Sequence, residues 1–154
     1  MDNYSSLNSL LQPCTDIISA LSNASSYLNL MLNDINWVGF YLFKNNELIL
    51  GPFQGKPACT NIAIGKGVCG RCAEEQKPII VDNVHAFKGH IACDSQSKSE
   101  IVIPIFIHDH FYGLLDIDSP SYSRFNNDDL IYLENVINVI TNKIEELMTC
   151  SNSL

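Results

Sequence analysis

The fold is decided by residues 35–50, which read INWVGFYLFKNNELIL. Aromatic and β-branched residues fill positions 35–43, as is typical of a strand, and the Asn45-Asn46 pair is typical of a hairpin turn before residues 47–50. Successive side chains alternate between the faces of a strand. The first strand is therefore expected to carry Trp37, Gly39 and Tyr41 on one face, and Val38, Phe40 and Leu42 on the other.

A second hairpin is expected from residues 100–107 and 111–118, joined by the polar His108-Asp109-His110 turn. Between the hairpins, residues 51–98 are irregular, with a short helical stretch near residues 68–75 and a short strand at residues 79–81.

Helices are expected at both ends of the chain. Residues 7–34 predict two helical pieces, with Pro13 and the Ser25-Ser26 pair as start signals. Near the C-terminus, apolar residues recur at three- and four-residue steps behind a cap at Asn127, with two aspartates in the first turn. The pattern predicts an α+β domain whose central antiparallel sheet is covered by N- and C-terminal helices. We expect one domain over residues 1–150 and a short tail over residues 151–154.

Composition narrows the function classes. The chain has 154 residues, of which 46% are apolar, and its formal net charge is −8 with no basic run. Binding to nucleic acid or to an anionic membrane depends on basic residues, so neither partner is expected. The first basic residue is Lys44 and no apolar run approaches a membrane span, which predicts a cytoplasmic protein.

Six cysteines are many for a cytoplasmic chain, where thiols are kept reduced and a cluster of them indicates redox chemistry or metal binding. Cys59 and Cys69 follow glycine-rich segments that we interpret as loops suited to reactive thiols, and Cys93 precedes the second hairpin. A zinc site built from Cys59, Cys69, Cys72 and Cys93 has only one CxxC pair and irregular gaps, so no metal is expected. Cys93 has an equally good interpretation as a small buried apolar side chain, whereas the locations of Cys59 and Cys69 suit reactive thiols better.

Three carboxylates lie in apolar surroundings on the second hairpin: Glu100, Asp116 and Asp118. Strand parity points Asp116 and Asp118 to one face, and Glu100 on the paired strand is placed to join them. Three acids that face one another repel, which favours protonation of at least one near neutral pH. For Asp118 alone, capping of the following turn is an equally good explanation.

Six motifs together resemble the free methionine-(R)-sulfoxide reductase family, which is built on a single GAF domain. They are NWVGFYL (36–42), GPFQGKPAC (51–59), GKGVCG (65–70), GHIACD (89–94), SEIVIP (99–104) and LDIDSP (115–120). The chain departs from the family at residues 81–84 and 87–90, where prolines are absent, and Cys72 is an extra cysteine.

The resemblance implies a GAF-like fold and thiol-dependent reduction of free L-methionine (R)-S-oxide. It implies that Cys93 attacks the sulfoxide sulfur and that Cys59 or Cys69 converts the resulting sulfenic acid into a disulfide. It also implies that thioredoxin, which receives its electrons ultimately from NADPH, reduces this disulfide. Glu100 and Asp118 are expected to protonate the oxygen and Asp116 to bind the substrate's ammonium. Trp37 and Tyr41 are expected to contact the methyl end of the substrate, although both also suit a core. No resident cofactor is required.

The other function class is a small-molecule sensor, because GAF domains elsewhere bind ligands without turnover. Such domains usually serve an attached output module, and three thiols beside three acids favour the enzyme. The resemblance further suggests a role in the oxidative stress response. The apolar terminal helices make a homodimer reasonable.

Overall fold

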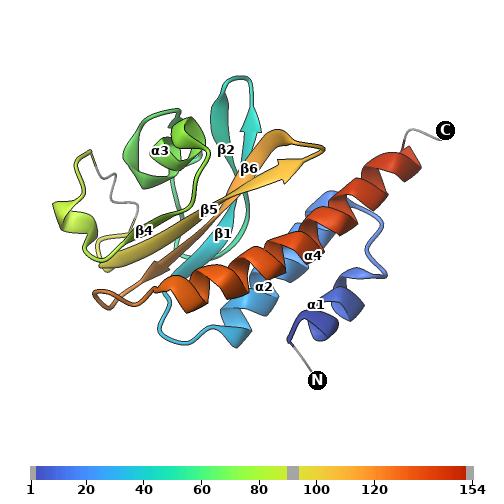
Figure 1. Ribbon diagram of the computed structural model, residues 1–154, viewed down its shortest axis with the longest axis horizontal. Helices are drawn as coiled ribbons and strands as arrows, with labels where there is room; N and C mark the ends of the chain where they lie inside the picture. Colours follow the sequence, from blue (N-terminus) through green and yellow to red (C-terminus); the bar gives the residue numbers. More distant parts are fainter. Residues whose placement is uncertain (1–2, 90–93, 152–154) are drawn as a thin grey trace.

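A computed structural model describes residues 3–89 and 94–151 of the chain, and it contains one antiparallel sheet with helices on both faces (Figure 1). The strand order is β3-β2-β1-β6-β5-β4. The strands are β1 (Trp37–Lys44), β2 (Glu47–Gly55), β3 (Asn61–Ala63), β4 (Ile79–Val81), β5 (Ser99–Ile107) and β6 (His110–Ser119). The predicted α+β class and both predicted hairpins are confirmed.

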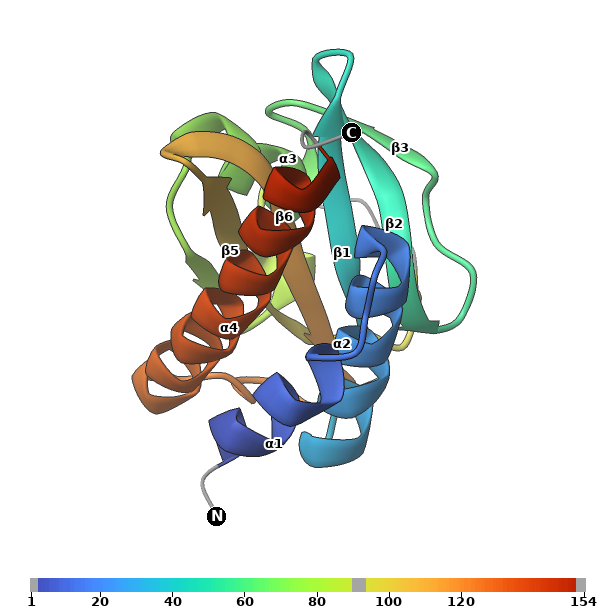
Figure 2. The ribbon, with the colours of Figure 1, turned by 90° about the vertical axis from the view of Figure 1, so that its right-hand side faces the viewer.

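Helices α1 (Asn3–Leu11), α2 (Ile17–Met31) and α4 (Asn127–Ser151) pack together on one face of the sheet (Figure 2). Helix α3 (Gly67–Glu75) covers the other face, and a 3-10 turn, η1 (Val84–Ala86), follows β4. Within residues 3–89 and 94–151, no helix combines the length and the apolar character needed to cross a membrane.

Both hairpin turns use two residues in the left-handed region. Asn45 and Asn46 have φ of 51° and 64°, and His108 and Asp109 have φ of 48° and 64°. Such turns match the right-handed twist of the strands that they join. His110, which we assigned to the turn, is instead the first residue of β6.

The predicted helix starts need three corrections. Pro13 does not start a helix, because it lies in the connection between α1 and α2. The second N-terminal helix does not begin at Ser25: α2 runs through this position from its cap at Asp16, whose side chain accepts from the Ile18 amide at 2.7 Å. Inside the helix, the Ser25 hydroxyl donates to the Ser22 carbonyl instead of capping a new start. The cap of α4 is Asn126 instead of Asn127, because the Asn126 Oδ1 accepts from the amides of residues 128 and 129. The Asp129 carboxylate accepts in return from the Asn126 amide, which completes a capping box.

Two apolar cores lie on opposite faces of the sheet. The larger one joins α1, α2 and α4 to the sheet and includes Val38 and Phe40, whereas the smaller one beneath α3 includes Trp37, Tyr41 and Leu114. The alternation predicted for β1 is therefore confirmed. It directs the two large rings to the same face as α3.

Candidate active site

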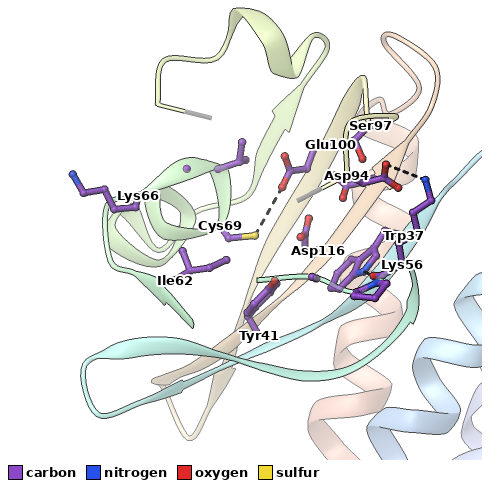
Figure 3. Close-up of a pocket in the computed structure, with 15 residues that line it drawn as sticks. Trp37, Tyr41, Lys56, Ile62, Lys66, Cys69, Asp94, Ser97, Glu100 and Asp116 are labelled. Atoms are coloured by element: carbon purple, nitrogen blue, oxygen red, sulfur yellow. Dashed lines mark hydrogen bonds and ion pairs between the residues drawn. The ribbon is translucent and has the colours of Figure 1, made fainter. Parts of the chain in front are cut away.

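A pocket opens between the sheet and the beginning of α3 (Figure 3). Its empty volume is about 560 Å³, which includes the open solvent at its mouth. Strands β1, β5 and β6 supply its floor, and residues 56–58 and 66–69 supply its walls. Six of the eight predicted site residues line it: Trp37, Tyr41, Cys69, Glu100, Asp116 and Asp118.

The three carboxylates meet because of the register of the second hairpin. Glu100 is paired with Asp118 and Val102 with Asp116, so the three acidic side chains reach the same face from neighbouring positions. Glu100 and Asp116 are buried, with 5% and 6% of their surfaces exposed. The Asp116 Oδ1 is buried and has no hydrogen-bond partner within the described part of the chain.

Burial sets the protonation of this cluster. Desolvation raises the pKa of Asp116 from its ordinary value of 3.8 to about 6, although side-chain hydrogen bonds with Glu100 and Cys69 act in the opposite direction. Desolvation, followed by the charges of Asp116 and Asp94, raises the pKa of Asp118 well above its ordinary value. Burial therefore favours the protonated form of both carboxyl groups.

Cys69 lies in the first turn of α3, which confirms the helical stretch expected near residues 68–75 and corrects the interpretation of its glycine-rich surroundings as a loop. Its Sγ is 3.8 Å from the Glu100 Oε1, and the thiol is buried. Desolvation and the charges of Asp116 and Glu100 raise its pKa well above the ordinary value. Cys69 is consequently a protonated thiol in this state.

The other thiols have separate locations. Cys72 is fully buried one turn further along α3, and desolvation raises its pKa to about 12. Cys59 is half-buried and follows Ala58, a residue of the pocket wall. Its backbone carbonyl accepts a hydrogen bond of 2.9 Å from the Tyr41 hydroxyl. Cys93 lies outside the described residues.

The two predicted aromatics form one layered wall. Trp37 and Tyr41 have ring centroids 6.0 Å apart at an interplanar angle of 25°, and Phe53 also stacks on Trp37, with ring centroids 5.3 Å apart. The Trp37 Nε1 donates to the Lys56 carbonyl at 3.1 Å. The polar atoms of both rings are thus held by the segment that contains residues 56–59, which leaves ring surface to line the pocket.

A polar network at the pocket mouth was missed from the sequence. The Asp94 carboxylate accepts hydrogen bonds from the Gln96 amide at 2.9 Å and from the Asn36 Nδ2 at 3.1 Å, and it pairs with the Lys56 Nζ at 3.5 Å. Asn36 also donates to the Ser97 hydroxyl at 3.0 Å. The Gln96 bond, the Asn36 bond and the Lys56 charge outweigh desolvation and hold the pKa of Asp94 below its ordinary value. The only sequence signal was that Asn36, Lys56 and Asp94 fall inside conspicuous motifs.

The side chains that could hold a metal ion are not the four cysteines considered from the sequence. Among the described residues, one ligand atom from each of Cys69, Glu100 and Asp116 lies within 4.8 Å of the others. Cys59 and Cys72 are not part of this group.

Comparison with known proteins gives consistent similarities. Residues 6–144 match the family model of the GAF domain. The chain is 46% identical over 122 residues to the free methionine-R-sulfoxide reductase of Escherichia coli, covering 79% of this chain and 74% of that protein. The reduced form of fRMsr from Staphylococcus aureus superposes with a TM-score of 0.88 at 52% identity, covering 92% of each chain. Free methionine-R-sulfoxide reductase from Neisseria meningitidis, solved in complex with its substrate, has a TM-score of 0.90 at 35% identity and covers 96% of this chain and 89% of its own.

Proposed function

Because the chain belongs to the free methionine-(R)-sulfoxide reductase family of GAF-domain proteins, we propose that it reduces free L-methionine (R)-S-oxide to L-methionine. One observation on the molecule supports this function most strongly. A buried carboxyl cluster in which burial raises the pKa values of Asp116 and Asp118 lies beside a thiol and a pair of stacked aromatic rings.

Sulfoxide reduction by a thiol needs a proton for the departing oxygen. In our proposal Glu100 and Asp118 hydrogen-bond or protonate the sulfoxide oxygen, which makes the sulfur electrophilic. Burial raises the pKa of Asp118 and thereby suits it to hold that proton. Trp37 and Tyr41 present ring surface to the methyl group.

The charged end of the substrate needs groups of both signs. Asp116 accepts the ammonium group in this proposal, and its unpartnered Oδ1 supports that role. Four acids line the pocket, so the substrate's carboxylate requires a cation. Lys56 is suited to this role because its side chain is 58% exposed at the mouth and is free to turn from Asp94 to the substrate.

The thiol steps follow the oxidation chemistry of cysteine. Cys93 attacks the sulfur, methionine leaves, and Cys93 becomes a sulfenic acid; a second thiol then condenses with it, releasing water and forming a disulfide. Cys59 is better suited than Cys69 to this second step, because it is half-buried whereas burial keeps the Cys69 thiol protonated. Thioredoxin, reduced at the expense of NADPH, reopens the disulfide by exchange.

The remaining features of the proposal concern the whole chain. We place the catalytic unit in residues 1–150 and its action in the cytoplasm, where thiols are kept reduced. Exposed apolar side chains on α2 and α4, among them Leu30 at 80% and Ile131 at 51%, support a homodimer through these helices. Light scattering of the reduced protein tests that assembly.

The function is tested with the separated R and S epimers of free methionine sulfoxide, in the presence of thioredoxin, thioredoxin reductase and NADPH. We expect methionine from the R epimer only, no turnover by Cys93→Ser, and full turnover by the control Cys150→Ser, which changes an exposed thiol near the end of α4. Absence of turnover of both epimers by folded, reduced protein would overturn the proposal. Ligand binding without turnover would then favour the sensor class.

A further inference from the structure

We propose that Cys69, Glu100 and Asp116 form a site for a zinc ion, and that the bound ion excludes the substrate. The site itself is argued from the geometry of these three side chains. The exclusion of substrate rests on the proposed reductase function.

The spacing of the three ligand atoms fits zinc. They lie within 4.8 Å of one another, and the Cys69 Sγ is 3.8 Å from the Glu100 Oε1. In a tetrahedral site with Zn–S of about 2.3 Å and Zn–O of about 2.0 Å, sulfur and oxygen ligands are about 3.5 Å apart. The Cys69–Glu100 pair is therefore within a few tenths of an ångström of this spacing, and the remaining ligand atoms, which lie up to 4.8 Å apart, reach it by approaching by about 1 Å.

A buried oxygen already lacks a partner at this place. Asp116 is 6% exposed, and its Oδ1 accepts no hydrogen bond from any residue of the described segments. A buried polar atom without a partner is unfavourable, and coordination of a cation would satisfy it. The three side chains also come from three elements, α3, β5 and β6, whose packing fixes their separation.

The chemistry of the ligands favours zinc over a hard cation. Ca²⁺ and Mg²⁺ prefer six or more oxygen ligands, whereas one thiolate with two carboxylates is a donor set that suits zinc. The pocket beside the cluster leaves the fourth position to water, as in zinc sites with three protein ligands. A divalent cation also offsets the charge of a pocket that four acids and two lysines line.

Zinc and the ammonium group of the substrate bind the same carboxylate, that of Asp116, in these proposals. In the proposed function Asp116 accepts the substrate's ammonium, and a zinc ion bound to that carboxylate leaves it unavailable. The two ligands are consequently mutually exclusive, and zinc is expected to act as a competitive inhibitor that a chelator removes.

Binding is tested by titrating Zn²⁺ into the reduced protein by calorimetry. The background carries Cys59→Ser and Cys93→Ser, so that neither of these thiols contributes. We expect one equivalent, weakened at least tenfold by Cys69→Ser and, separately, by Asp116→Asn. The matched control is Cys72→Ala, which removes a buried thiol from the same helix outside the cluster and is expected to retain binding.

Cobalt provides a second readout of the same site. Co²⁺ bound to the cluster should show a thiolate-to-metal charge-transfer band that is present in the Cys72→Ala variant and absent in the Cys69→Ser variant. Binding that is equal in all variants would identify an adventitious ion only and overturn the site, as would the absence of any binding. Using Cys69→Ser and Asp116→Asn in parallel keeps the test decisive if one of them misfolds, which circular dichroism reports.

Inhibition is measured separately from binding. Zn²⁺ should raise the apparent KM for free methionine (R)-sulfoxide without lowering the maximal rate, and EDTA should reverse the effect. Zinc bound at the cluster with no change in KM would overturn the exclusion of substrate. A folded protein that binds zinc there but turns over neither epimer would support the site and refute the proposed function, so the two failures are distinguishable.

Discussion

Substitution of Asp116 by asparagine should make the protein more stable at neutral pH while reducing its activity. Asp116 is buried, and desolvation raises its pKa from 3.8 to about 6. One pKa unit corresponds to about 1.4 kcal/mol, so ionisation of this carboxyl inside the fold costs about 3 kcal/mol relative to ionisation in the unfolded chain. Asparagine has nearly the same shape and does not ionise.

The pH dependence gives the sign of the effect. Between pH 3.8 and about 6 the folded wild type binds more protons at Asp116 than the unfolded chain does, so the free energy of unfolding falls as the pH rises through this window. The contribution of protonated Asp116 to the free energy of unfolding is fully present below pH 3.8 and is lost above about pH 6. The stability advantage of Asp116→Asn over wild type should therefore grow by about 3 kcal/mol from pH 3.5 to pH 7.5.

The assay is urea unfolding of both proteins at several pH values across this range, followed by circular dichroism. The exposed Asp82 provides the control, because Asp82→Asn should change stability by no more than about 0.5 kcal/mol at any pH. In the same samples, kcat/KM of Asp116→Asn should fall about ten- to a hundredfold, since a charged contact to the substrate is lost. If the stability advantage of Asp116→Asn over wild type stays constant or shrinks as the pH rises, the conclusion that burial makes ionisation of Asp116 unfavourable is refuted.

Three further predictions concern the pocket mouth, the hairpin and the Cys59 segment. Lys56→Met should raise KM about fivefold to tenfold with kcat unchanged, as measured by steady-state kinetics, because a cation that binds ground state and transition state alike is lost. Gly113→Ala should lower the free energy of unfolding by about 2–4 kcal/mol in urea titrations. The new Cβ would lie 2.3 Å from the Tyr41 carbonyl oxygen, and this oxygen cannot move away without breaking the β1–β6 pairing. Tyr41→Phe removes the hydroxyl that donates to the Cys59 carbonyl, and should slow disulfide formation in single-turnover mass spectrometry while costing about 1 kcal/mol of stability.

The regular part of the fold was predictable from short-range patterns. The alternation around Trp37 and the Asn45-Asn46 pair identified β1 and its turn, because a half-buried strand and a left-handed turn each restrict which residues fit. The error at Ser25 has a physical cause. Serine often caps a helix, but its hydroxyl here bonds to the carbonyl three residues earlier, and burial of Leu21 and Leu28 on the same helix carries α2 through the position.

The site was predictable where it depends on strand parity. Glu100, Asp116 and Asp118 belong to paired strands, so alternation alone brought them to one face. The network around Asp94 was not predictable in this way, because Asn36, Lys56 and Asp94 come from three separate segments whose approach depends on tertiary packing. The burial of Cys69 was missed for a similar reason. Its glycines suggested a loop, whereas one close contact, the Gly70 position against the Ala63 carbonyl, lets α3 pack tightly on its neighbours.

The chemistry of the pocket depends on the register of the second hairpin, and that register is fixed far from the pocket. The His108-Asp109 turn sets the first pair, and an irregularity between Ile105 and Phe106 shifts the pairing before it reaches the acids. Because side chains alternate with a period of two, a slip by one residue in one strand would turn Glu100 away from Asp118. The turn and the irregularity therefore decide whether three carboxyl groups share one buried space. Since that shared burial is what raises the pKa values of Asp116 and Asp118, these distant backbone features are part of the catalytic apparatus that we propose.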